Sequence, residues 1–258
     1  MNSHKSTTEM KSAAREILLG KYGSYIGAYI TAELMLTLIS FVASSVLPSD
    51  NTWGMVFNLA ISFVIELIGA VFLLGMIQYT LNMCTGNPYK LSDVFYGFRS
   101  HPDKAIICKF LFIVAELVCL LPAILFGVLY SINENGLLLI VAALFFVIGL
   151  VIAVIIHLTL YFVYYLILDY PDATVKELLL YCANMMRGQR IKLFYLYASF
   201  LPMYVLGILS LGIGLLFVEP YVNVTLAQFY LNVFFVEAEE NDKVVSENEV
   251  SQVNIAEL

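Results

Sequence analysis

Residues 137–168 read LLLIVAALFFVIGLVIAVIIHLTLYFVYYLIL, and His157 is the only residue among them with an acidic or basic side chain. At a rise of about 1.5 Å per residue, an apolar helix of about 20 residues crosses the ~30 Å of hydrocarbon in a bilayer. This run is longer than that and contains no proline. It therefore predicts a helix that spans a membrane.

Comparable apolar runs on both sides extend this prediction to an all-α, polytopic transmembrane helix bundle of about six spans. The predicted spans cover about residues 24–47, 55–84, 106–131, 137–168, 193–217 and 221–236. Turn signals separate them, the last at Glu219-Pro220, and we expect residues 1–236 to form one membrane-embedded domain. Five spans follow directly from length. The last run is short and polar, so a full span and a re-entrant helix both remain open for it.

Composition supports the same class of protein. The chain is 61% hydrophobic and 13% charged, whereas soluble domains are roughly 45–50% apolar and about 25% charged. The net charge of −7 arises mostly in residues 237–258, which carry seven acids and one lysine and are predicted to be a disordered cytoplasmic tail. The first twenty residues lack a signal-peptide pattern, so the first span is expected to act as an uncleaved insertion signal. We expect the lipid bilayer as partner and no nucleic acid.

The distribution of Lys and Arg predicts the orientation, because cytoplasmic loops are enriched in both. Twelve of the 13 cations fall on one side of the predicted spans. They are Lys5, Lys11, Arg15, Lys21, Lys90, Arg99, Lys104, Lys109, Lys176, Arg187, Arg190 and Lys192. We therefore expect a multi-pass protein of the plasma membrane with both termini in the cytoplasm.

Three cytoplasmic segments have the spacing of amphipathic helices. Ser6 and Glu9, and likewise Thr174 and Glu177, form capping-box patterns before apolar helical faces, and residues 91–98 repeat apolar side chains at helical spacing. Two interpretations remain open: these helices lie on the bilayer surface, or they pack under the bundle. The cations Arg187, Arg190 and Lys192 follow the third segment and are candidates for contact with lipid headgroups.

Four ionisable residues fall inside predicted spans, where a charge costs several kcal/mol. They are Glu33, Glu66, Glu116 and His157. The glutamates are expected roughly 14–17 Å deep and His157 closer to the cytoplasmic face, with no Lys or Arg at the depth of the carboxyls.

Small or polar residues share a helical face with each of these four positions, as on faces that pack against other helices. These neighbours are Tyr29, Thr37, Ser40 and Ser44; Asn58, Ser62 and Gly69; Cys119, Ala123 and Gly127; and Gly149, Ala153, Tyr161 and Tyr164. We therefore expect the carboxyls to converge inside the bundle. They either bind a proton or cation, or form structural hydrogen bonds as neutral acids.

Sequence patterns of known enzyme sites are missing from the chain. There is no nucleophile elbow, zinc-protease helix, phosphate-binding loop or dinucleotide fingerprint. We expect no catalytic residues, no cofactor and no metal. Pro122 and Pro202 are expected to kink the third and fifth spans, Pro220-Tyr221 to make a sharp outer turn, and Gly207, Ser210 and Gly214 to allow close packing.

Motifs in the C-terminal third resemble a known family. In order, they are Leu168-Asp169-Tyr170-Pro171, Met185-Met186-Arg187-Gly188, Lys192-Leu193-Phe194, Ser199-Phe200, Leu211-Gly212-Ile213-Gly214, Pro220-Tyr221 and Phe229-Tyr230. With Ala14-Arg15-Glu16-Ile17-Leu18 and Gly97-Phe98, the chain resembles the bacterial membrane family called domain of unknown function 975, found mainly in Firmicutes. Pro202 departs from the residue expected there. The resemblance implies a polytopic membrane protein and supplies no catalytic residues.

Two functional hypotheses follow. The first is a non-enzymatic membrane protein that acts through contacts with lipid or another membrane protein, in envelope homeostasis, assembly or immunity. The alternative is a small transporter or channel-like protein that uses its intramembrane carboxylates to bind protons or cations.

Overall fold

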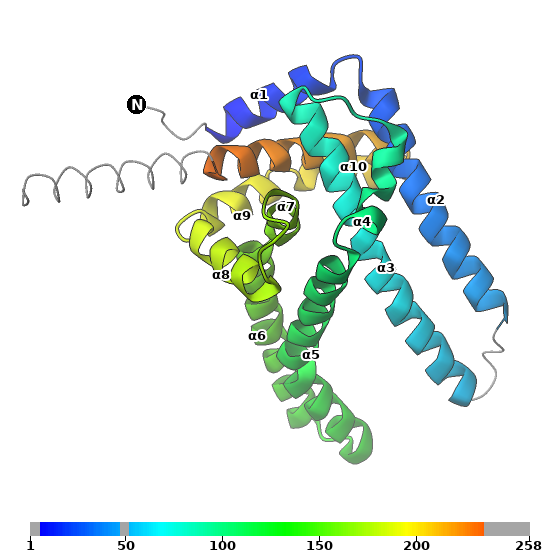
Figure 1. The fold of residues 1–258 in the computed structure, drawn as a ribbon. Coiled ribbons are helices and arrows are strands. Elements are labelled where there is room, and N and C mark those ends of the chain that lie inside the picture. Colours follow the sequence, from blue (N-terminus) through cyan, green and yellow to red (C-terminus); the bar gives the residue numbers. More distant parts are fainter. Residues whose placement is uncertain (1–5, 47–51, 235–258) are drawn as a thin grey trace, which may run out of the picture. The chain divides into compact units, whose positions relative to one another are not determined.

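In the computed structural model, the residues described are 6–46 and 52–234, so the predicted acidic tail lies outside them. All regular structure in these two ranges is helical (Figure 1). The helices are α1 (Thr7–Leu18), α2 (Tyr22–Val46), α3 (Thr52–Thr85), the 3-10 helix η1 (Leu91–Phe95), α4 (Tyr96–Arg99), α5 (Pro102–Asn133), α6 (Gly136–Leu160), α7 (Val163–Asp169), α8 (Val175–Met185), α9 (Arg190–Ala198) and α10 (Leu201–Leu209). A further helix covers residues 215–234.

Five stretches of helix are long and apolar enough to cross a membrane. They are Tyr22–Ala43, Thr52–Thr85, Pro102–Asn133, Gly136–Asp169 and Arg190–Leu209. These stretches coincide with the first five predicted spans, so the prediction of an all-α, multi-pass membrane protein is confirmed.

The described helices form two compact units. The first consists of the residues before Gly27, Thr80–Pro88 and the chain after Phe194, and the second of Gly27–Tyr79 and Tyr89–Phe194. In the first unit, the helix over 215–234 supplies much of the core, including the fully buried Phe229 and Tyr230. Residues 221–234 of the short sixth run therefore lie in this helix, whose 20 described residues measure about 30 Å. It is not among the five stretches above, so the choice between a full span and a re-entrant helix stays a prediction.

The predicted turn at Pro220-Tyr221 is wrong, because both residues lie within the helix over 215–234. The chain turns earlier, at residues 210–214, where Leu211 and Gly212 adopt positive φ angles of 58° and 84°. Glycine adopts this left-handed conformation without steric cost, which suits Gly212, whereas the side chain of Leu211 makes it costly there. A proline inside a helix removes one hydrogen bond and does not by itself end the helix.

Close packing at this turn is confirmed. A Cβ atom added to Gly214 would lie 2.9 Å from the Cα atom of Gly207. The Ser210 hydroxyl accepts a 2.8 Å hydrogen bond from the N–H of Gly214 and donates one of 2.7 Å to the carbonyl of Gly207.

Pro202 interrupts the fifth predicted span as expected. The pyrrolidine ring of a proline clashes with the carbonyl four residues earlier, and α9 ends at that residue, Ala198. Pro202 then lies in the first turn of α10, where a missing N–H costs little. By contrast, α5 continues through Pro122.

The three amphipathic segments pack against protein. Met10, Ala14 and Leu18 of α1 are buried, as are Leu178, Cys182 and Met185 of α8, and Val94 of η1. Both predicted capping boxes are present, at Ser6 with Glu9 and at Thr174 with Glu177. Packing within the protein thus covers part of each apolar face, whereas Leu91 and Phe98 stay exposed.

Candidate functional site

The second unit contains a tight helical hairpin of α5 and α6. Its connection is short because Glu134 takes a left-handed conformation and Asn135 caps α6, its side chain accepting a 3.0 Å hydrogen bond from the N–H of Leu137. A Cβ atom on Gly149 would lie 2.4 Å from the carbonyl oxygen of Cys119. The backbones of the two helices are thus in direct contact at the small residues that the sequence placed on their packing faces.

His157 and Glu116 meet across this hairpin. The imidazole Nε2 lies 2.5 Å from a carboxylate oxygen of Glu116. The ring of Phe112 stacks on the imidazole, with centroids 5.5 Å apart and planes at 13°. The side chains of His157 and Glu116 remain 53% and 45% exposed, so the pair lies at the edge of the α5–α6 seam.

Glu66 forms a second ion pair, with Lys109. The Nζ atom of Lys109 lies 2.9 Å from a carboxylate oxygen of Glu66, and Phe63 packs edge-on against Phe110 beside it. The expectation that no cation shares the depth of the carboxyls is therefore wrong. Because α5 begins at Pro102, Lys109 lies in its third turn, and its flexible stem carries the ammonium to α3.

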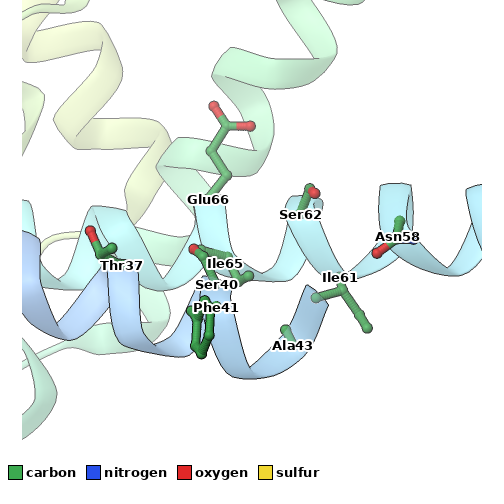
Figure 2. A pocket seen from close by; sticks show the side chains of 9 residues that line it. All are labelled: Thr37, Ser40, Phe41, Ala43, Asn58, Ile61, Ser62, Ile65 and Glu66. Carbon is green, nitrogen blue, oxygen red and sulfur yellow. The ribbon is translucent and has the colours of Figure 1, made fainter. Parts of the chain in front are cut away.

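A groove of about 530 Å³ lies between α2 and α3 in the second unit (Figure 2). Its lining includes polar residues predicted for the packing faces, namely Thr37, Ser40, Asn58, Ser62 and Glu66. The Ser40 hydroxyl is bonded to the carbonyl of Leu36 in its own helix. Figure 2 shows the carboxylate of Glu66 pointing away from α2, in keeping with its bond to Lys109.

The carboxyls do not come together at one point. Glu66 pairs with Lys109 and Glu116 with His157, while Glu33 is exposed on α2. Lys109 and Glu116 are seven residues apart on α5, about 10 Å along the helix axis, which separates the two pairs. Within residues 6–46 and 52–234, no group of three or more His, Cys, Asp and Glu side chains could hold a metal ion.

The candidate headgroup contacts lie around the start of α9. Arg187 and Lys192 are exposed, and Gly188, with φ of 84°, makes the turn that ends the α8 segment. Arg190 differs from both. Its Nε atom is buried and has no hydrogen-bond partner among the described residues.

Polar contacts in the first unit were not predicted. Lys11 donates a 2.6 Å hydrogen bond to Ser199 and lies 4.5 Å from the ring centre of Phe200, and Arg15 bonds the hydroxyl of Tyr221 at 3.3 Å. Partial burial, and then the neighbouring Arg15, lower the pKa of Lys11. The hydrogen bond to Tyr221 raises the pKa of Arg15. The only sequence signal for these contacts is the four-residue spacing of Lys11 and Arg15, which puts both on one face of α1.

Comparison with known proteins identifies the family of the chain. The family model described as protein of unknown function (DUF975) matches residues 1–236. The chain belongs to the DUF975 family. The DUF975 match includes all the helices described above and ends where the acidic segment begins. No curated protein and no solved structure matches the chain significantly.

Proposed function

We propose that this DUF975 protein is a non-enzymatic component of the bacterial plasma membrane, and that it acts by binding another membrane protein through the α5–α6 hairpin. The observation that carries the proposal is the half-exposed Glu116–His157 pair. The proposal narrows the broader hypothesis of action through protein or lipid contacts in envelope homeostasis, assembly or immunity.

The exposed half of the Glu116–His157 pair carries an energetic cost in a membrane. An ionised side chain near the centre of a membrane helix costs ~2.5–3.5 kcal/mol on insertion scales. Pairing with His157 offsets part of this cost, yet about half of each side chain is left uncovered. A polar group on the surface of a partner helix would satisfy the remaining hydrogen-bonding capacity, whereas lipid chains offer none.

The rest of the hairpin supports the same proposal. In the most apolar windows of the two long spans over Pro102–Asn133 and Gly136–Asp169, only 6% and 11% of residues are buried within the chain. Helices in multi-span proteins gain stability from packing against other helices. The unburied surface of these two spans is therefore large enough to contact a partner helix as well as lipid.

Orientation follows from the cations. With the loops rich in Lys and Arg in the cytoplasm and the helix over 215–234 as a sixth crossing, both termini are cytoplasmic and the α5–α6 connection at Glu134-Asn135 faces outward. A partner on the hairpin would thus be reached inside the membrane.

Photo-crosslinking in native membranes tests the proposal. A photoreactive residue at the exposed Leu117 of α5, next to Glu116, should give a discrete protein adduct, identified by mass spectrometry, that Glu116→Gln weakens. The same residue at Phe41 of α2, also exposed, serves as the control. Lipid adducts alone from Leu117, or identical products from Leu117 and Phe41, would contradict the proposal.

The alternative function is a small transporter, and the direct His157–Glu116 contact is the observation that favours it. A histidine in direct contact with a carboxylate is a common element of proton relays in membrane transporters. Proton flux into vesicles that contain the protein, abolished by Glu116→Gln, would support transport. Glu33→Gln and Glu66→Gln show whether further carboxyls take part, and unchanged flux in all three variants would exclude a carboxylate-dependent route.

A further inference from the structure

A second groove in the second unit combines an apolar channel with an unpaired cation. It has a volume of about 520 Å³ and lies between α6 and α9. Five aliphatic side chains between Leu150 and Leu158 line it on α6, and Arg190, Ile191 and Phe194 line it on α9. Leu150 and Leu158 are about 12 Å apart along the helix, so the groove is long and narrow.

Arg190 is the one residue with a charged side chain among those that line this groove, whose surface is otherwise apolar. Its Nε atom is buried and makes no hydrogen bond within the described part of the chain. A buried N–H group without a partner is costly, and most such groups in proteins are bonded. The geometry therefore calls for an acceptor that the chain itself does not supply.

The surroundings of Arg190 favour an anion as that acceptor. Arg190 begins α9, and the first N–H groups of a helix lack carbonyl partners and attract negative charge. Arg187 and Lys192 are exposed nearby in the sequence, and neither forms an ion pair with the described residues. Of these three cations, Arg190 lines the groove itself.

We infer that this groove binds one anionic phospholipid, with an acyl chain between α6 and α9 and the phosphate on Arg190. A phospholipid joins the two chemistries that the groove combines, because guanidinium binds phosphate in a planar, charge-assisted geometry and the aliphatic wall matches an acyl chain. A free phosphate would leave the apolar wall uncovered. The inference is independent of the function proposed for the α5–α6 hairpin.

Native mass spectrometry of the full chain in mild detergent tests the charge requirement. Wild-type protein should retain phosphatidylglycerol in preference to phosphatidylcholine with the same acyl chains. Arg190→Gln should weaken phosphatidylglycerol binding about tenfold, and Arg190→Lys less, because lysine keeps the charge without the planar fork. Lys176→Gln removes an exposed cation of α8 and should leave binding unchanged.

Two further variants test the acyl-chain channel. Val154→Phe places a larger side chain in the groove and should displace the lipid, whereas Ile152→Phe, on α6 but outside the lining, should not. Inorganic phosphate should fail to compete. Equal retention of both lipids, equal effects of Arg190→Gln and Lys176→Gln, or displacement by millimolar phosphate would each overturn the inference. If Arg190→Gln does not fold, Arg190→Lys and Val154→Phe decide it.

Discussion

Lys109 of α5 reaches Glu66 of α3, with 2.9 Å between its ammonium nitrogen and the carboxylate. Both residues lie in helices long and apolar enough to span a membrane, so each neutralises a charge that would otherwise face hydrocarbon. The pair joins α3 to α5 within the second unit.

Removing only one member of this pair should destabilise the protein. Lys109→Met leaves the Glu66 carboxylate unpaired and should cost about 1–3 kcal/mol. The double variant Lys109→Met with Glu66→Gln should recover most of that loss, since no isolated charge remains. Thermal unfolding in detergent, combined as a double-mutant cycle, measures the coupling. Strictly additive losses would show that the two side chains do not interact.

Gly149 should tolerate no side chain. A methyl group there would meet the Cys119 carbonyl at 2.4 Å, so Gly149→Ala must separate α5 from α6 and should cost about 1–3 kcal/mol. Gly127→Ala is the matched control, because a Cβ atom at Gly127 meets nothing within 4 Å. The control should be neutral or stabilise slightly, since alanine suits a helix interior better than glycine. Equal melting temperatures for the two variants would contradict the close contact.

The N-terminus of α8 should become less stable in acid. The pKa of Glu177 is held below its ordinary value of 4.5 by the hydrogen bonds from the backbone N–H and then the hydroxyl of Thr174. A carboxyl with a depressed pKa in the folded state stabilises the fold above its unfolded pKa, and this contribution is lost as the pH falls through the folded pKa. Protection of α8 amides should therefore decrease below about pH 4.5.

Hydrogen exchange measures this effect after correction for the intrinsic pH dependence of exchange. Glu177→Gln is the control, because its amide still caps the helix but does not titrate over this range. If wild type and Glu177→Gln lose the same protection in acid, then another group causes the change.

How far the sequence predicts this structure depends on the range of the contact. The spans and the capping boxes at Ser6 and Thr174 follow from local patterns. So do the packing faces that carry Cys119 and Gly149, because small residues mark such faces, but the contact between these two residues does not. The Lys109–Glu66 pair could not be predicted in this way. Hydropathy leaves the start of α5 uncertain by about one turn, and a lysine side chain reaches about one further turn along the helix, so the depth of the ammonium group is not defined by the sequence. Local sequence patterns thus predict the helices, but they do not predict contacts between side chains far apart in the sequence, such as Lys109 and Glu66.

The turn at Leu211 and Gly212 shows a second limit. Both Pro220 and the Gly212–Gly214 pair are turn signals, and single-sequence reasoning has no basis for choosing between them. At the turn that forms, Gly207 and Gly214 pack at backbone distance. Likewise, nothing local indicates that Arg15 meets Tyr221, more than two hundred residues away.

The hydroxyl groups of Tyr25 and Thr80 form a buried hydrogen bond in the first unit. Their oxygens are 3.0 Å apart, and the two residues are 1% and 2% exposed. Thr80→Val keeps the shape but removes one partner, so it should cost about 1 kcal/mol. The side chain of Asn223 also bonds the Tyr25 hydroxyl, which keeps the loss from being larger.

Thr225→Val is the matched control for this prediction. Thr225 is as well buried, but its hydroxyl donates only to the carbonyl of Tyr221, one turn earlier in the same helix. That carbonyl is already an acceptor within the helix, so losing the extra bond should cost less than losing the contact between α2 and α3. Chemical or thermal unfolding in detergent ranks the two variants. A larger loss for Thr225→Val would mean that the Tyr25–Thr80 bond contributes little to joining these helices.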